Sequence, residues 1–169
     1  MDLLIRPGGP EDQRSLLFLF DEAVQWLTAR GLEGQWGSQP WSERPESQKL
    51  VLEMTTNSGF TVAEIGPDTV GALIISDDPP PYVPAASEPD LYIDLLLVSR
   101  RYTGHRIGST LLDYARTECR NRGRTLLRLD CWAGGNRELV RYYEGEGFTP
   151  TDVFRQGDWP GQLLVQQLS

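Results

Sequence analysis

The chain has 169 residues, 39% of them hydrophobic and 9% aromatic, which indicates one globular domain and excludes a disordered chain. Its net charge of −8 is divided unevenly, with 5 basic and 16 acidic residues in 1–98 against 11 and 8 in 99–169. This balance disfavours a nucleic-acid partner. The asymmetry suits either an ordinary acidic surface or a protein that holds a polyanion with its second half and a cation with its first.

Apolar runs and cysteines exclude further classes. No apolar stretch approaches the ~20 residues that span a bilayer, so no membrane partner is expected. The first residues lack a basic leader followed by an apolar region, which favours a cytoplasmic protein. Cys119 and Cys131 match neither a metal site nor a disulfide framework, so no metal is expected.

The first part of the chain predicts one strand and two helices. Residues 3–7 predict the strand, and Pro10 begins a helix that ends at Gly31. After an irregular stretch, a second helix is expected over about 46–56. The apolar face of the first helix is marked by residues at spacings of four, three and four: Leu16, Phe20, Ala23 and Leu27.

The middle of the chain predicts a hairpin and then a buried strand. Residues 60–65 and 69–76 are two strands joined by a turn. Residues 77–90 contain five prolines and predict a long surface loop. Residues 91–98 form an almost continuous apolar run, which is typical of a central strand covered on both faces.

The last part predicts a βαβ unit followed by antiparallel strands. Helices are expected over 106–122 and 136–146, and strands over 126–132, 148–155 and 162–168. The complete order is β-α-α-β-β-β-α-β-α-β-β, so the fold class is α+β, a mixed α/β single domain that spans residues 1–169.

A turn with two glycines, Gly104 and Gly108, connects the apolar strand to the next helix. Such glycines let backbone N–H groups approach a phosphate, and the helix N-terminus adds partial positive charge. The same turn is equally explained as a tight turn with solvated arginines. Neither the Gly-Lys-Ser/Thr of a Walker loop nor the third glycine of a dinucleotide fingerprint is present.

The strand, the basic turn Gly104-His105-Arg106-Ile107-Gly108 and the following Leu111-Leu112 resemble the acetyl-CoA motif of the GNAT N-acetyltransferase superfamily. The motif is commonly written Gln/Arg-x-x-Gly-x-Gly/Ala. Here Thr103 stands where Gln or Arg is usual, and Arg106 stands where the first Gly is usual.

A second match lies downstream. Leu127–Asn136, followed by Tyr142-Tyr143 and Gly147-Phe148, resembles the strand–Asn–helix–Tyr–Gly–Phe segment of the same superfamily. The two matches occur in order over about residues 91–150, which would be the acyl-CoA-binding core. The resemblance implies a mostly antiparallel sheet of about seven strands with a splayed parallel central pair, and about four helices.

The resemblance also implies how acetyl-CoA would be held. Pantetheine would pair with the strand Leu95–Val98, the pyrophosphate would lie on the amides of the turn, and Asn136 would either bond pantetheine or simply cap its helix. The donor-binding residues are therefore expected to be Leu96, Leu97, Val98, Arg101, Thr103, Gly104, His105, Arg106, Ile107, Gly108, Ser109, Asn136 and Tyr143.

The resemblance gives Tyr143 the role of proton donor to the leaving thiolate, against a simple packing role. A Tyr hydroxyl is protonated at neutral pH and can donate directly. Asp94, a carboxylate within an apolar strand, is expected to be the base or a substrate anchor, and otherwise an ion pair with Arg128. Cys131 is expected to pack in the core, and Asp130 to be structural.

The acceptor site is expected to be aromatic and acidic. Trp36 and Trp41 lie in an irregular stretch, Tyr82 lies in the proline-rich loop, and Tyr92 shares a strand face with Asp94. Such walls suit an apolar or aromatic amine.

Three functions remain open from the sequence. The first is an enzyme that moves an acetyl group from acetyl-CoA to a primary amine of a small molecule or peptide. The second is a catalytically silent acyl-CoA-binding sensor or regulatory module, and the third is an unrelated ATP or NAD domain. A homodimer is an option, because dimers are common in this superfamily.

Overall fold

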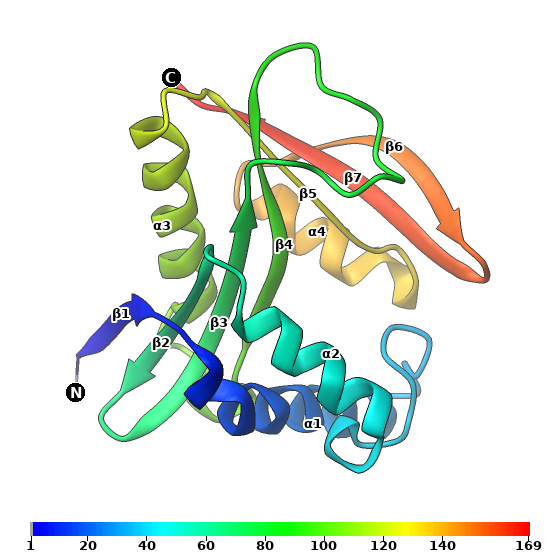
Figure 1. Ribbon diagram of the computed structural model, residues 1–169. Coiled ribbons are helices and arrows are strands. Elements are labelled where there is room, and N and C mark those ends of the chain that lie inside the picture. The colour runs from blue at the N-terminus through cyan, green and yellow to red at the C-terminus, as the bar shows by residue number, and fades with distance from the viewer. Residues whose placement is uncertain (1) are drawn as a thin grey trace. The chain divides into compact units, whose positions relative to one another are not determined.

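The computed structural model describes residues 2–169. These residues form seven strands, four α-helices and short 3₁₀ turns, and Figure 1 labels the helices and strands. The strands are β1 (Leu3–Pro7), β2 (Phe60–Ile65), β3 (Asp68–Ser76), β4 (Asp90–Val98), β5 (Leu126–Trp132), β6 (Thr149–Gln156) and β7 (Trp159–Gln167). The helices are α1 (Gln13–Ala29), α2 (Pro45–Thr55), α3 (Ile107–Asn121) and α4 (Glu138–Gly145).

The strands form one mixed sheet in the order β1-β2-β3-β4-β5-β7-β6. The pairs β1–β2, β2–β3, β5–β7 and β6–β7 are antiparallel, whereas β4–β5 is parallel. The predicted α+β class, the seven strands with a parallel central pair and the four helices are therefore confirmed.

The parallel pairing of β4 with β5 is short. The registered pairs run from Asp90–Leu126 to Ile93–Leu129, and β5 continues beside β7 as far as the pair Trp132–Gly161. The next residues on the two parallel strands are Asp94 and Asp130, and in the described part of the chain they form no registered pair. Two carboxylates therefore stand where the strands part, a place called the fork below.

By their contacts, the residues divide into two compact units. The first unit comprises the chain up to Ile74 together with Leu95–Leu112. In this unit α1 and α2 lie next to each other (Figure 1) and cover an apolar core. The buried members of that core are Leu16, Leu19, Phe20, Ala23, Val24, Trp41, Val51, Phe60, Val62, Ala72, Ile74 and Leu97.

The second unit comprises Ile75–Asp94 and Asp113–Ser169. Here the proline-rich loop packs on the sheet through Val83, which clusters with Tyr92 and Leu163. Arg128 is 4% exposed and donates from Nε to Asp90 at 2.7 Å and from Nη1 to the Pro84 carbonyl at 2.9 Å. The suggested pairing of Arg128 with Asp94 is therefore wrong: Tyr92 lies opposite Arg128 in the register, and the nearer carboxylate is two residues earlier on β4.

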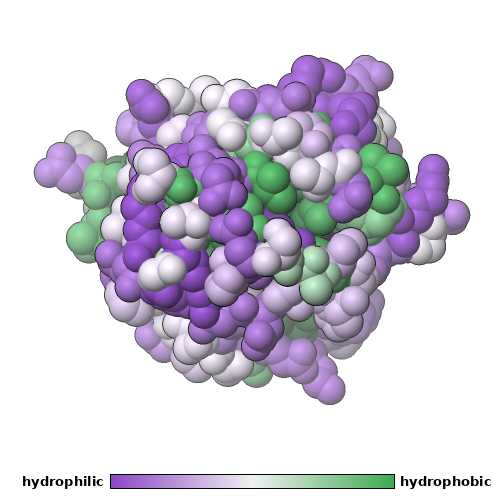
Figure 2. All heavy atoms as spheres, turned by 90° about the horizontal axis from the view of Figure 1, so that it is seen from above, coloured by the Kyte–Doolittle hydropathy of each residue, from purple (hydrophilic) through white to green (hydrophobic). Residues whose placement is uncertain are grey.

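The surface is mainly polar where it can be seen. Figure 2 shows a face on which polar side chains predominate and interrupt the apolar ones. Within residues 2–169, no helix combines the length and apolarity needed to cross a bilayer.

A buried carboxylate fixes the start of the first unit. Arg6 Nη2 donates to Asp12 Oδ1 at 2.8 Å, and the Gly9 N–H donates to Asp12 Oδ2 at 3.0 Å. The Arg6 guanidinium also donates from Nε to Glu64 at 2.9 Å. The hydrogen bonds from Arg6, and then that from Gly9, lower the pKa of Asp12, whereas burial opposes them.

We predict that Asp12→Asn lowers the free energy of unfolding at pH 7 by about 1–3 kcal/mol, because Arg6 loses a charged partner. The folded-state pKa of Asp12 is depressed, so wild-type stability is lost as pH falls below about 4, the ordinary Asp value, and the variant lacks this component. Urea unfolding across pH, with exposed Asp158→Asn as control, measures both effects. Equal unfolding free energies at pH 7 would contradict the prediction.

Candidate functional site

The turn after β4 is anchored within the first unit by its own backbone. The Ser99 N–H donates to the Val70 carbonyl at 2.8 Å, and Ser99 Oγ accepts from the Arg101 N–H at 3.2 Å. A 3₁₀ turn follows over Arg100–Tyr102, and the Tyr102 hydroxyl donates to Asp68. The chain is thus fixed in direction before it reaches Thr103.

Residues 103–106 are exposed and lead directly into α3. Gly104 has φ +88°, and a Cβ added there would meet no heavy atom within 4 Å. The first N–H groups of α3, from Ile107 onward, have no partner inside the helix and point out of its N-terminus. An open backbone, a helix N-terminus and neighbouring arginines together fit an anion such as a pyrophosphate.

Arg106 explains one departure from the family motif. The sequence predicted a helix from residue 106, but Arg106 has φ +54°, and α3 begins one residue later. This left-handed conformation is the one that glycine adopts without cost, which is why glycine is usual there. An arginine at this position adds a positive charge to the turn, but its left-handed backbone conformation is strained and lowers the stability of the fold.

The two preceding arginines are engaged by α1 of the same unit. Arg101 Nε donates to Glu22 Oε2 at 2.9 Å, and the Arg100 N–H donates to Glu22 Oε1 at 2.8 Å. The Arg100 guanidinium lies 3.8 Å from the Trp26 ring centroid. Arg101 remains 45% exposed, so it can still present its terminal nitrogens to a ligand.

The strand segment expected to face pantetheine lies just before this turn. Leu96 and Val98 are half-buried, whereas Leu97 is 3% exposed and belongs to the core of the first unit. The side chains therefore alternate between core and accessible positions, and the strand backbone is what this segment can offer to a ligand.

Carboxylates and hydroxyls meet at the fork in the second unit. Asp130 Oδ2 accepts hydrogen bonds from the hydroxyls of Tyr82, at 3.1 Å, and Tyr92. Burial raises the pKa of Asp130, and the bonds from Tyr92 and Tyr82 oppose that rise. Loss of hydration also raises the pKa of Asp94; the nearby Ser76 hydroxyl opposes this rise, and the charge of Asp130 adds to it.

The tyrosines at the fork differ in exposure. Tyr92 is 1% exposed, so with its hydroxyl on Asp130 it has almost no surface left for a ligand. Tyr82 is 44% exposed, and its ring centroid lies 5.3 Å from that of Phe154. Phe154 in turn lies 6.4 Å from Trp159. The fork therefore has an acidic floor and an aromatic wall within one unit.

Tyr143 lies in α4 with 7% of its surface exposed. Its ring contacts Tyr142 and Phe148 at centroid distances of 5.1 and 5.9 Å. Burial raises the pKa of Tyr143 above its ordinary value, so the hydroxyl keeps its proton. Burial also raises the pKa of Cys131 to about 12, so its thiol stays protonated and is a poor nucleophile.

The entry to α4 is left-handed over three residues. Gly135, Asn136 and Arg137 have φ of +61°, +61° and +62°. Arg137, and not Asn136, occupies the N-cap of α4, and the Arg137 side chain makes no capping hydrogen bond. Asn tolerates the left-handed region better than most residues, which accounts for its place here.

Trp36 and Trp41 lie together in the first unit. Trp41 is 8% exposed, stacks on Phe20 at 4.1 Å and donates from Nε1 to the Trp36 carbonyl at 3.3 Å. Trp36 is half-buried against the same core. These contacts hold the loop onto α1 and leave Trp36 as the more accessible ring.

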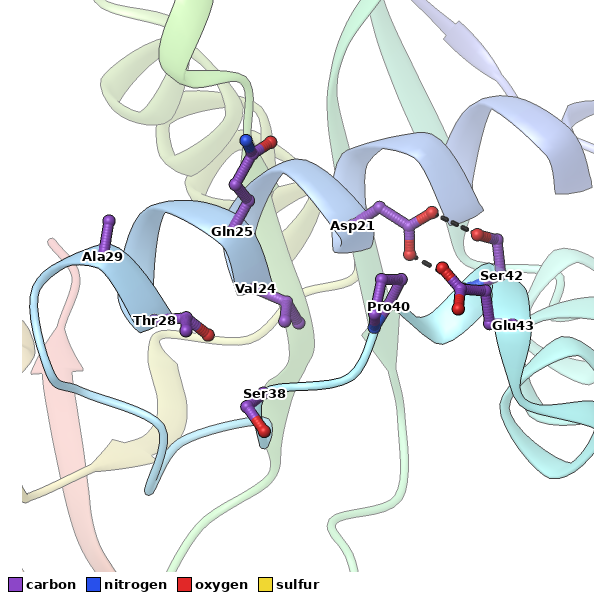
Figure 3. A pocket seen from close by; sticks show the side chains of 9 residues that line it. All are labelled: Asp21, Val24, Gln25, Thr28, Ala29, Ser38, Pro40, Ser42 and Glu43. Carbon is purple, nitrogen blue, oxygen red and sulfur yellow. Dashed lines mark hydrogen bonds between the residues drawn. The ribbon is translucent and has the colours of Figure 1, made fainter.

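A cavity of about 480 Å³ lies between α1 and the loop that carries these tryptophans. Figure 3 shows Asp21 reaching from α1 to Ser42, whose N–H donates to it at 3.0 Å and whose hydroxyl also bonds it. The Thr28 hydroxyl oxygen is buried without a protein partner. The lining residues are Asp21, Val24, Gln25, Thr28, Ala29, Ser38, Pro40, Ser42 and Glu43.

Sequence reasoning missed two residues with central contacts. Asp130 was assigned a structural role, although its place directly after Leu129 on a strand parallel to β4 could have indicated a position beside Asp94. Glu22 gave no local signal, because its partners lie 78 and 79 residues away.

Comparison with known proteins gives one family. A family model described as the acetyltransferase (GNAT) family matches residues 19–148. An uncharacterized N-acetyltransferase of Bacillus subtilis (strain 168), YesJ, is 26% identical over 155 residues, which cover 84% of this chain and 79% of that protein.

Solved structures share the fold. A GNAT-family acetyltransferase from Listeria monocytogenes 4b F2365 has a TM-score of 0.72 at 20% identity, covering 98% of this chain and 95% of that one. The PaiA N-acetyltransferase of Thermoplasma acidophilum, solved in complex with coenzyme A, has a TM-score of 0.69 at 18% identity, covering 99% of each chain.

We predict that Arg106→Gly raises the free energy of unfolding by about 1 kcal/mol, because it removes a side chain from a left-handed position. The matched variant Arg120→Gly makes the same change within α3, where it should destabilise by up to about 1 kcal/mol. Chemical denaturation measures both. A loss of stability in Arg106→Gly as large as that in Arg120→Gly would show that the turn is not strained.

Proposed function

Because the chain belongs to the GNAT acetyltransferase family, we propose that it transfers an acetyl group from acetyl-CoA directly to a primary amine of a small molecule or peptide. The observation that carries the proposal is the fork, where β4 and β5 part after Ile93 and Leu129 and leave Asp94 and Asp130 at the opening. A parting of this kind gives polar side chains access to a ligand inside a sheet that is otherwise continuous.

The donor is proposed to bind through the turn that leads into α3. The amides at the helix N-terminus and the charges of Arg101 and Arg106 would hold the pyrophosphate, and Thr103–Ser109 would surround it. The backbone of Leu96–Val98 would pair with the pantetheine amides. This assignment is supported by the exposure of residues 103–106 and by the open space at Gly104.

Acetyl-CoA supplies a thioester, whose acyl carbon is attacked by the amine and whose sulfur leaves as a thiolate. A backbone N–H near Leu97 or Val98 would stabilise the developing oxyanion. The Tyr143 hydroxyl would give its proton to the thiolate. Burial keeps the Tyr143 hydroxyl protonated, as a donor must be, although the raised pKa also makes it a weaker acid than an ordinary tyrosine.

Asp94 is proposed to accept the proton that the amine loses. It is exposed on β4, and its raised pKa makes its carboxylate a better base than an ordinary aspartate. Asp130 would attract the protonated amine before the transfer, with Tyr82 as an aromatic wall beside it. On the first unit, Trp36 is proposed as an acceptor contact in its own right, and Trp41, buried on Phe20, is left with a packing role.

We predict that Tyr143→Phe lowers kcat about 10²- to 10³-fold with little change in KM for acetyl-CoA, because only the proton donor is lost. Steady release of CoA thiol with a panel of amines measures this. Tyr142→Phe, one residue away and 41% exposed, is the matched control. If acetyl-CoA binds, no amine raises thiol release and Tyr143→Phe changes nothing, the chain is a silent acyl-CoA-binding module.

We predict that kcat/KM falls as pH drops through an apparent pKa above about 4, the ordinary Asp value, because Asp94 must be deprotonated to act as a base. Asp94→Asn should lower kcat/KM about 10²-fold and should no longer show this fall at low pH. The control Asp152→Asn, at an exposed position, should keep the wild-type kcat/KM and the wild-type fall. The pH profile is measured with two acceptors whose amines differ in pKa. A fall in kcat/KM that is due to Asp94 occurs at the same pH with both acceptors, whereas a fall that is due to protonation of the acceptor moves with the pKa of its amine. A fall of the first kind that persists in Asp94→Asn would exclude Asp94 as the base.

A further inference from the structure

Three residues of α1 at spacings of four contact the donor-binding turn. Phe18, Glu22 and Trp26 lie one helical turn apart and therefore share one face of the helix. Together they are called the α1 clamp below. Phe18 is 51% exposed despite its size, so its position is not explained by the core.

Glu22 makes the central contacts of the α1 clamp. Its Oε1 accepts from the Arg100 N–H at 2.8 Å, and its Oε2 accepts from Arg101 Nε at 2.9 Å. The Glu22 side chain is itself only 15% exposed, whereas its partner Arg101 is 45% exposed, so the two bonds hold a surface turn onto a partly buried carboxylate. The Arg100 N–H is the first of the 3₁₀ turn and has no partner within that turn, so Glu22 caps it from another element.

The two aromatic rings complete the hold on the arginines. The Arg101 guanidinium lies 5.0 Å from the Phe18 ring centroid, and the Arg100 guanidinium lies 3.8 Å from that of Trp26. Cation–π contacts of this kind limit where a guanidinium can point. The α1 clamp thus fixes both the backbone and the charged side chains at the entrance to the phosphate turn.

The sign of the charge makes this arrangement informative. A carboxylate beside an anion site repels a phosphate and neutralises part of the Arg101 charge, so Glu22 does not serve donor binding as a charge. What it supplies is geometry, since a turn already held in its binding conformation loses less entropy when the ligand arrives.

We propose that Glu22 is a positioning residue for the phosphates of acetyl-CoA, acting through Arg100 and Arg101. The inference rests on the proposed function, because it takes Arg101–Ser109 as the phosphate turn. It differs from that function in placing a determinant of donor affinity on α1, outside the motif that binds the donor.

The test compares two donors and three variants by calorimetric titration. Acetyl-CoA carries the phosphates, and S-acetylpantetheine lacks them. Glu22→Gln removes the charge and one of the two acceptor oxygens, and Glu22→Asp keeps the charge but is one methylene too short for both contacts. Glu53→Gln, an exposed carboxylate of α2, is the control for loss of a charge.

Both Glu22 variants are expected to weaken acetyl-CoA binding about tenfold, because two charge-assisted hydrogen bonds are disturbed. Binding of S-acetylpantetheine and kcat at saturating acetyl-CoA should remain within about twofold of wild type. Thermal unfolding identifies a variant that fails to fold, in which case Glu22→Asp, the smaller change, decides the outcome.

Other results would overturn the inference. Tighter acetyl-CoA binding in Glu22→Gln would mean that Glu22 acts mainly by repelling the phosphates. Unchanged binding would mean that Glu22 has no role in donor binding. Equal weakening of both donors would indicate a general structural role. Wild-type protein that binds no acetyl-CoA would overturn the proposed function as well, whereas normal wild-type binding with unaffected Glu22 variants would overturn only the role of Glu22.

Discussion

Strands β4 and β5 are paired over four registered pairs, from Asp90–Leu126 to Ile93–Leu129. The place where this pairing stops decides which carboxylates of the second unit lie inside the sheet and which lie at the fork. Before that point the Asp90 carboxylate is buried and forms an ion pair with Arg128 at 2.7 Å, and Arg128 Nη2 has no hydrogen-bond partner in the described part of the chain. Beyond it Asp130 accepts hydrogen bonds from two tyrosine hydroxyls instead of an arginine, and loss of hydration raises the pKa of both Asp94 and Asp130. A difference of a few residues along one strand therefore separates a carboxylate that supports the fold from one that is free to do chemistry.

In the first unit, a strained residue of the turn before α3 is stabilised by contacts of the residues that precede it. Arg106 is held in a left-handed conformation that costs stability, and the residues before it are tied down by Ser99, Tyr102 and Glu22. Strained residues persist when the surrounding structure fixes them from several sides. The contacts around the turn are what allow an arginine to occupy a position that suits glycine.

The sequence predicts the elements well because their signals are local. Apolar periodicity gives α1, and a continuous apolar run gives β4, each within a few residues of the observed bounds. Partners of polar side chains are harder to predict, because they depend on register. Asp90 rather than Asp94 meets Arg128, and Asp130 lies beside Asp94, only because Ile93 pairs with Leu129. Glu22 resembles any solvated helical carboxylate until the distant chain that it contacts is in place.

The loop of residues 77–89 has five prolines, and it is fastened to the sheet at Val83 and Pro84. Prolines restrict the unfolded chain, so holding such a loop in one shape costs less conformational entropy than holding an ordinary one. The aromatic surface of Tyr82 is therefore formed before any ligand arrives. An acceptor that contacts Tyr82 would bind to a loop that already has its final conformation. The affinity for such an acceptor would therefore depend on the shape of the acceptor more than on the entropy lost by ordering the loop.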